Sequence, residues 1–160
     1  MIQLTYADIN YTAYVTTEDK RINTSVPVAN IGLLFKFTND LSGAVKYAYS
    51  NSTSINDRYS QVRFTHNTTE DVFTGDIDLK PFGYWKYEVY EVSYTGTVPV
   101  LTKDNSPSNE NDTADIQSGI YGTVQGLVEV GKMYVSETVG QEQVKYTEYT
   151  ETQGNNYIYL

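Results

Sequence analysis

The sequence predicts an all-β fold, an antiparallel β-sandwich with little or no helix. Three observations lead to this prediction. The 16 tyrosines and 20 threonines, together with many valines, suit the pleated, half-buried surface of a sheet. No stretch shows the apolar period of 3.6 residues that marks an amphipathic helix. Short alternating segments instead recur about every 8–12 residues with polar turns between them, which is typical of a sandwich or barrel.

The first half of the chain contains the clearest alternation. Tyr11, Ala13 and Val15 share one face of their segment, and Val62 and Phe64 point inward from theirs. The polar residues 39–43 have the chemistry of a hairpin turn, with Asn and Asp opening it and a glycine supplying positive φ. We also expect a turn at residues 51–57. The expected strands are residues 2–6, 9–17, 31–38, 44–50, 59–65 and 72–79.

The longest expected strand, residues 84–95, changes phase along its length. Trp85, Tyr87 and Val89 share one face, but beyond them the large apolar residues fall on the other face. A side-chain period of two cannot shift in this way without an extra residue, so we predict a β-bulge near residues 89–91. The alternative is a strand buried on both faces, which the charges within the segment disfavour.

Residues 103–115 form the one break in composition. They carry many Asp and Asn residues and no large apolar residue. This composition predicts an exposed loop, which is the best candidate for disorder in the chain. Beyond this loop we expect the C-terminal strands within residues 116–160. They are residues 116–124, a hairpin across 127–135 that turns at 130–132, and residues 144–149 and 157–160. Residues 1–160 are thus read as a single sandwich, immunoglobulin-like or jelly-roll-like.

Charge and composition exclude several classes of function. The net charge is −9 and the pI is near 4.4, which argues against nucleic acid, because affinity there depends on Lys and Arg neutralising phosphates. The absence of cysteine excludes disulfides and Cys-ligated metal sites. No apolar run is long enough to span a membrane, so no membrane partner is expected. The opening residues lack the basic and apolar regions of a signal peptide.

Residue types that perform chemistry are scarce, so no enzyme, cofactor or metal is expected. The one histidine, His66, lies in a polar stretch and is interpreted as a solvated residue. No nucleophile elbow, phosphate-binding loop or dinucleotide glycine pattern occurs. A glycosidase needs only a pair of carboxylates, and Glu88 and Glu91 are the candidates. They fall on opposite faces of a regular strand, and their simpler interpretation is two solvated residues.

Three further patterns each leave an alternative open. The Asp- and Asn-rich residues 104–115 offer oxygen ligands to calcium, but they lack the EF-hand spacing. Five N-x-[ST] sequons begin at Asn10, Asn23, Asn51, Asn67 and Asn111, and are read as a by-product of an Asn- and Thr-rich surface. An aromatic platform for a sugar is the third pattern, although such residues more often pack between sheets. Its members would be Tyr84, Trp85, Tyr87 and Tyr90.

Several stretches resemble small virion proteins of tailed phages, especially phages of Bacteroidetes and their crAss-like relatives. The matching stretches are residues 34–40, 57–59, 81–91, 126–135 and 155–160. They are patterns of strands and turns, so the resemblance transfers no catalytic residue. It implies a structural role, an auxiliary or decoration protein on the capsid shell of a virion, made in the host cytoplasm.

The implied partners are the major capsid protein or other virion subunits, including further copies of this chain. Tyrosine is a frequent anchor of protein interfaces, and the chain has more tyrosines than a core of this size needs. We therefore name Tyr90, Tyr94, Tyr157 and Tyr159 as candidate partner contacts. Residues 156–160 are expected either to complete this sheet or to be offered to a neighbour as a strand. Alternative functions are a carbohydrate-binding or adhesive module and a tail, collar or head-fibre component.

Overall fold

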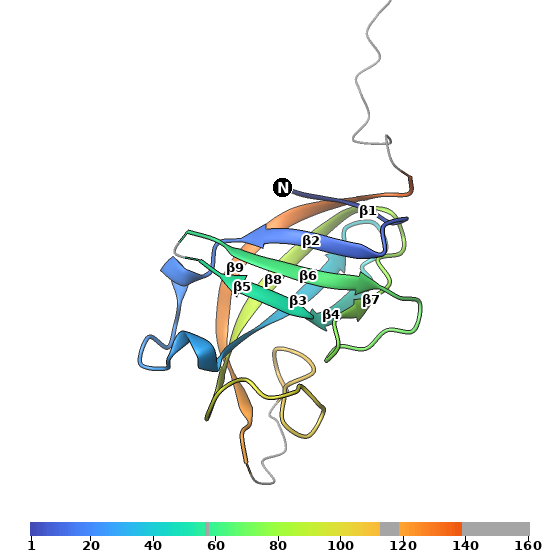
Figure 1. The fold of residues 1–160 in the computed structure, drawn as a ribbon. Coiled ribbons are helices and arrows are strands. Elements are labelled where there is room, and N and C mark those ends of the chain that lie inside the picture. The colour runs from blue at the N-terminus through green and yellow to red at the C-terminus, as the bar shows by residue number, and fades with distance from the viewer. Residues whose placement is uncertain (57, 113–118, 139–160) are drawn as a thin grey trace, which may run out of the picture.

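A computed structural model describes residues 1–56, 58–112 and 119–138 of the chain, and this part is built from β-strands (Figure 1). The strands are β1 (Ile2–Thr5), β2 (Asn10–Val15), β3 (Ile31–Asn39), β4 (Val45–Tyr49), β5 (Ser52–Ile55), β6 (Ser60–His66), β7 (Asp76–Ile77), β8 (Gly83–Tyr94) and β9 (Gly122–Ser136). Two short 3₁₀ turns, η1 (Glu18–Lys20) and η2 (Val28–Asn30), are the helical elements of the described residues. The all-β prediction is confirmed.

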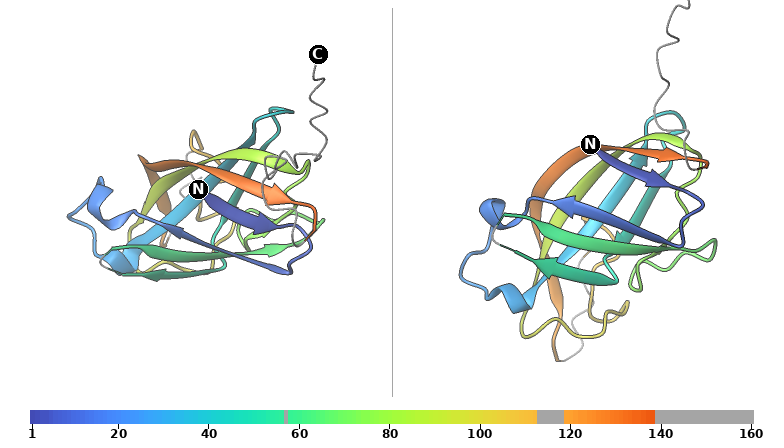
Figure 2. Two further views of the ribbon diagram at one scale, coloured as in Figure 1. Left: turned by 90° about the horizontal axis from the view of Figure 1, so that it is seen from above. Right: turned by 45° about the horizontal axis from the view of Figure 1, so that its top comes forward.

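The strands form two sheets that lie face to face (Figure 2). The large sheet has the order β1-β9-β8-β3-β4, and the small sheet has the order β2-β6-β5 with β7 beside β6. Most pairs are antiparallel, as predicted, but β1 runs parallel to β9 and β7 runs parallel to β6. The architecture is therefore sandwich-like with two parallel pairs at its margins.

The main core fills the space between the two sheets. Alternate residues of β2 and β6 face it from the small sheet, and Phe64 meets the rings of Phe35 and Phe37 edge-on at centroid distances of 4.9 and 5.6 Å. Such edge-to-face contacts add to the apolar area that the rings bury. Trp85 and Ile77, the other residues predicted for the core, are buried as well.

The phase change of β8 reflects burial on both faces. The strand pairs with β3 in unbroken register, so its own alternation never shifts. The pairing with β9 does shift between Val89 and Tyr90 and again between Glu91 and Val92, at the place predicted for the bulge. The extra residues belong to β9, however, where Val128 and Gln125 are left without a partner in β8. The bulge predicted for β8 is therefore found in β9, and β8 is the strand buried on both faces that was the alternative.

A second cluster lies on the outer face of the large sheet and explains this two-sided burial. It consists of the buried residues Leu34, Tyr49, Val92 and Tyr94, with partly buried neighbours that include Phe73, Tyr90, Val98 and Leu101. Residues 95–112 pack over it through the hydrogen bonds from Tyr49 Oη to the carbonyl of Pro107 (2.9 Å) and between Tyr94 Oη and Ser106 Oγ (3.0 Å). Residues 103–112 contain no strand, as predicted, but they are exposed only in part, because Ser106 and Pro107 are buried whereas Lys103 and Asp104 are exposed. Residues 113–115 lie outside the described part.

Three elements differ from prediction for local reasons. β9 is one continuous strand across the hairpin predicted at 130–132, because Gly131 lets it pass over the Tyr87 ring, where a Cβ would come within 2.4 Å. β5 occupies part of the stretch predicted as a turn, and β7 is only two residues long within the strand predicted at 72–79. The hairpin at 39–43 forms as predicted, with Asn39 Oδ1 accepting from the amides of Leu41 and Ser42. The strands predicted at 144–149 and 157–160 lie outside the described residues.

Candidate binding groove

A groove opens where the chain crosses from the large sheet to the small one. β4 pairs only with Leu34–Thr38 of β3, so Ile31–Leu33 have a strand neighbour, β8, on one side only among the described residues. After Tyr49 the chain leaves β4, and the Ser50 hydroxyl accepts from the amide of Arg63 (2.9 Å) as β5 begins. Within the described chain, β5 likewise pairs on one side only, with β6. Two unpaired strand edges therefore flank the same space.

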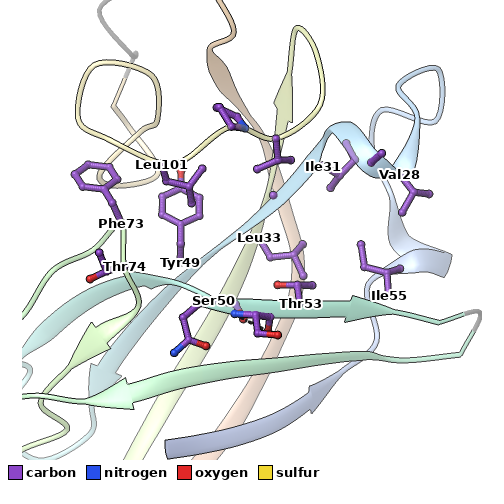
Figure 3. A pocket seen from close by; sticks show the side chains of 16 residues that line it. Val28, Ile31, Leu33, Tyr49, Ser50, Thr53, Ile55, Phe73, Thr74 and Leu101 are labelled. Carbon is purple, nitrogen blue, oxygen red and sulfur yellow. Dashed lines mark hydrogen bonds between the residues drawn. The ribbon is translucent and has the colours of Figure 1, made fainter.

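The groove has a volume of about 800 Å³ and is lined mainly by apolar side chains (Figure 3). Its floor is the open edge of β3, where Ile31 and Leu33 are buried. Thr53 and Ile55 line it from β5; they pair with the buried residues Val62 and Ser60, so they lie on the inner face of the small sheet. The remaining lining residues are Val28, Ala29, Gly32, Tyr49, Ser50, Asn51, Ser52, Phe73, Thr74, Val98, Pro99 and Leu101. Each of these described residues is uncharged at neutral pH.

One wall of the groove is the loop that covers the second cluster, and polar contacts hold this loop down. Glu110 accepts a hydrogen bond from the Tyr47 hydroxyl (2.7 Å) and pairs with the Lys36 ammonium. Burial raises the pKa of Glu110, but the hydrogen bonds from Lys36 and Tyr47 outweigh it and leave the pKa below its ordinary value. Burial, followed by the hydrogen bond to Glu110, raises the pKa of Tyr47 to about 12. Glu110 is therefore held ionised in this contact.

The opposite end of the groove is anchored by Glu91. Its carboxylate accepts hydrogen bonds from the amides of Ile22 (2.9 Å) and Asn23 (3.0 Å), and the side chain is 1% exposed. This contact fixes the segment that leads into η2, whose Val28 and Ala29 line the groove. The interpretation of Glu91 as a solvated residue is therefore corrected. Glu88 lies on the outer face, paired with Lys36 and Lys86, so the two carboxylates do not form a catalytic pair.

The predicted contact residues occupy different environments. Tyr94 is 3% exposed and packs between Gly32 and Gly122, which corrects the expectation that it is a surface contact. Tyr90, two positions along the same face from Val92, is partly buried against the second cluster. Tyr157 and Tyr159 lie outside the described residues. The structure therefore brings Tyr90 and Tyr94 to one cluster without exposing the pair.

The aromatic platform for a sugar does not form. Trp85 is fully buried, and its indole nitrogen donates to the carbonyl of Pro81 (3.1 Å). Tyr87 is buried too, and its hydroxyl donates to Glu129 (2.8 Å). Tyr84 is the most exposed member and lies beside Tyr134, with ring centroids 4.9 Å apart.

The other candidate polar sites are occupied by internal contacts. His66 ends β6 instead of lying in a solvated turn, and its ring sits 4.2 Å from that of Tyr6. In the loop proposed for calcium, Asp112 accepts from the amide and hydroxyl of Ser108, which lowers the pKa of Asp112, and Glu110 is engaged as above. Across residues 1–56, 58–112 and 119–138, no group of three or more His, Cys, Asp or Glu side chains is placed to hold a metal.

Comparisons with known proteins give no family for this chain. No protein-family model matches the sequence, and searches of curated proteins and of solved structures find no match either. None of the helical elements in the described residues is long and apolar enough to cross a membrane. The sequence does not predict the groove, because residues 51–57 have the composition of a turn, whereas Ser52–Ile55 forms the strand β5 in its wall. The alternation of the β-branched Thr53 and Ile55 was the available signal.

Proposed function

We propose that this chain is a non-enzymatic structural protein of a tailed-phage virion, an auxiliary or decoration protein that docks onto the capsid shell. The observation that carries the docking is the groove, an apolar space flanked by the open edges of β3 and β5. An extended segment of another subunit adds to such an edge through main-chain hydrogen bonds, while the walls select its side chains. The virion as the place of docking comes from the resemblance to virion proteins. The proposed partners are the major capsid protein or other virion subunits.

The chemistry of the groove favours binding over catalysis. General acid–base catalysis needs a titratable group within hydrogen-bond reach of the reacting atoms. Among the described lining residues the titratable group is Tyr49, whose hydroxyl is already donated to the carbonyl of Pro107. Burial also raises the pKa of Tyr49 far above neutrality. The groove therefore offers a surface for an apolar segment and no group suited to transferring protons.

The charge of the chain favours a protein partner. A net charge of −9 repels polyanions, whereas the groove is neutral and can accept an apolar segment without burying an unpaired charge. We propose the capsid surface as its location after synthesis in the host cytoplasm.

The number of copies per particle tests this proposal. Quantitative mass spectrometry of purified virions would compare this chain with the major capsid protein. A shell decoration protein occupies repeated lattice positions and should be present in hundreds of copies, whereas about a dozen or fewer would match a ring at the collar or tail. Complete absence from purified virions would contradict the proposal.

A further inference from the structure

The groove has two walls that face each other across the open edge of β3. Thr53 and Ile55 form one wall from the small sheet, and Val98 and Leu101 form the other from the loop over the second cluster. A strand added beside Ile31–Leu33 would continue the line of β4, and its alternate side chains would point toward the two walls in turn. Such a strand needs apolar residues at consecutive positions, unlike an edge strand with one face in water.

The sequence contains one segment of this kind outside the described residues. Residues 157–160 read Tyr157-Ile158-Tyr159-Leu160, apolar or aromatic at every position. We propose that these residues of a neighbouring copy fill the groove as a strand beside Ile31–Leu33. In this arrangement Ile158 and Leu160 would face Thr53 and Ile55, and the two tyrosines would face Val98 and Leu101. This inference rests on the proposed function, because it names the segment that the groove receives.

The position of the groove favours a neighbouring copy over the same chain. β9 ends at Ser136 beside Thr5, whereas Ile31 in the groove pairs with Ser93 at the other end of β8 (Figure 1). From Gly83 to Ser93 the sheet extends about 33 Å at the usual rise of a strand. Residues 137–156 span at most about 70 Å when fully stretched. Occupying its own groove would require about half of that maximum in a straight line, and more along a path around the molecule, and a neighbouring copy has no such requirement.

The arrangement makes each copy both a donor and an acceptor of a strand. The donated segment and the groove are different surfaces, so the contact is heterologous, and it closes into rings or continues from copy to copy. On a shell, the capsid lattice would decide which of these forms. The neighbouring copy is then the virion subunit that the groove receives, and copies linked in this way are held on the shell with a raised effective concentration.

Engineered cysteines test the contact directly, since the chain has no cysteine of its own. One full-length chain would carry Thr53→Cys and a second, separately tagged chain would carry Ile158→Cys. After mild oxidation of the mixture, we expect disulfide-linked pairs that join positions 53 and 158. The matched control is Ser54→Cys, since Ser54 is exposed on the same strand but pairs with Gln61 on the opposite face of the small sheet. We expect the Thr53→Cys mixture to cross-link at least about tenfold more than this control.

Several outcomes would overturn the inference. Equal cross-linking by Thr53→Cys and Ser54→Cys would do so. So would a closed disulfide within one chain carrying both Thr53→Cys and Ile158→Cys, because the segment would then occupy its own groove. Circular dichroism of each variant checks that it folds, and a Tyr157→Ser/Tyr159→Ser variant gives an independent readout. Its sedimenting mass should fall relative to Tyr14→Ser, an exposed tyrosine outside the groove, and an unchanged mass would contradict the proposal.

The same experiments separate this inference from the proposed function. Absence of the cross-link in a chain that is abundant in virions overturns the strand exchange and leaves the virion role standing. A cross-linking chain that is absent from virions keeps the strand exchange and overturns the virion role.

Discussion

The Tyr47 hydroxyl donates a 2.7 Å hydrogen bond to Glu110, joining β4 to a loop 63 residues further along the chain. Lys36 of β3 pairs with the same carboxylate. The loop held in this way covers the second cluster and supplies Val98 and Leu101 to the groove. The shape of the groove therefore depends on a polar contact made on the outer face of the large sheet.

Replacing Glu110 with glutamine should loosen this loop. Glu110→Gln keeps the shape of the side chain but removes the charge that attracts Lys36, whose pKa the hydrogen bond to Glu110 raises. Because hydrogen bonds to charged groups contribute about 1.5–3 kcal/mol, amide exchange across residues 103–112 should quicken by about tenfold or more. Hydrogen exchange with mass spectrometry measures this. The control Asp40→Asn removes a carboxylate paired with exposed Lys132, and should change stability by under about 1 kcal/mol.

Acid should release the same loop. The folded pKa of Glu110 lies below its ordinary value of 4.5, so the unfolded loop binds the proton more tightly than the folded one. The contribution of Glu110 to stability is therefore complete above pH 4.5 and is lost as the pH falls through the folded pKa. Asp112, whose pKa hydrogen bonds from Ser108 lower, acts in the same direction. The protection of the amides at 103–112, measured as the intrinsic exchange rate at each pH divided by the observed rate, should fall below this point in the wild-type chain. A Glu110→Gln variant with an equally steep acid dependence would contradict this account.

Removing the carboxylate of Glu91 should destabilise the protein and the end of the groove together. Glu91→Ala leaves the amides of Ile22 and Asn23 without their buried acceptor, and we expect a loss of about 2–4 kcal/mol in the free energy of unfolding. Chemical denaturation measures the loss. Glu88→Ala, on the exposed side of the same strand, should cost less because its ion pairs are partly solvated. An equal loss of unfolding free energy in the two variants would contradict the anchoring role of Glu91.

The main core should be sensitive at Phe64. This ring is 3% exposed and is held edge-on by Phe35 and Phe37. Phe64→Ala should therefore lower the free energy of unfolding by about 3–5 kcal/mol, because it leaves a cavity as well as losing apolar burial. A melting temperature close to that of the wild-type chain would place this ring outside the packed core.

Alternation was enough to predict the strands that bury one face. Val62 and Phe64 in β6, and Tyr11 in β2, point into the core as their period of two requires. Local turn chemistry was equally informative, because Asn39 and Gly43 specify their hairpin through contacts within five residues.

Elements whose environment comes from distant segments could not be predicted in the same way. The apolar residues Val92 and Tyr94 lie on the opposite face of β8 from Trp85, Tyr87 and Val89, which suggests a bulge. The sequence gives no sign that residues 95–112 return to cover that outer face. Gly131 suggests a turn at residues 130–132 in the sequence, whereas in the structure it allows β9 to pass close over the Tyr87 ring. Glu91 looked solvated because its partners, the amides of Ile22 and Asn23, carry no signal in their side chains. The groove is a product of the same long-range packing.

We propose that the chain acts by receiving an extended segment of another virion subunit in the groove between β3 and β5. The most direct measurement is the amount of chain that sediments with purified phage particles for two matched variants, Thr53→Arg and Ser54→Arg. Both place the same charge on β5, but Thr53 lines the inner wall of the groove whereas Ser54 faces away from it. We expect Thr53→Arg to bind at least about tenfold more weakly than Ser54→Arg, since an unpaired charge in an apolar site is costly to bury. Equal binding by two folded variants would contradict the claim.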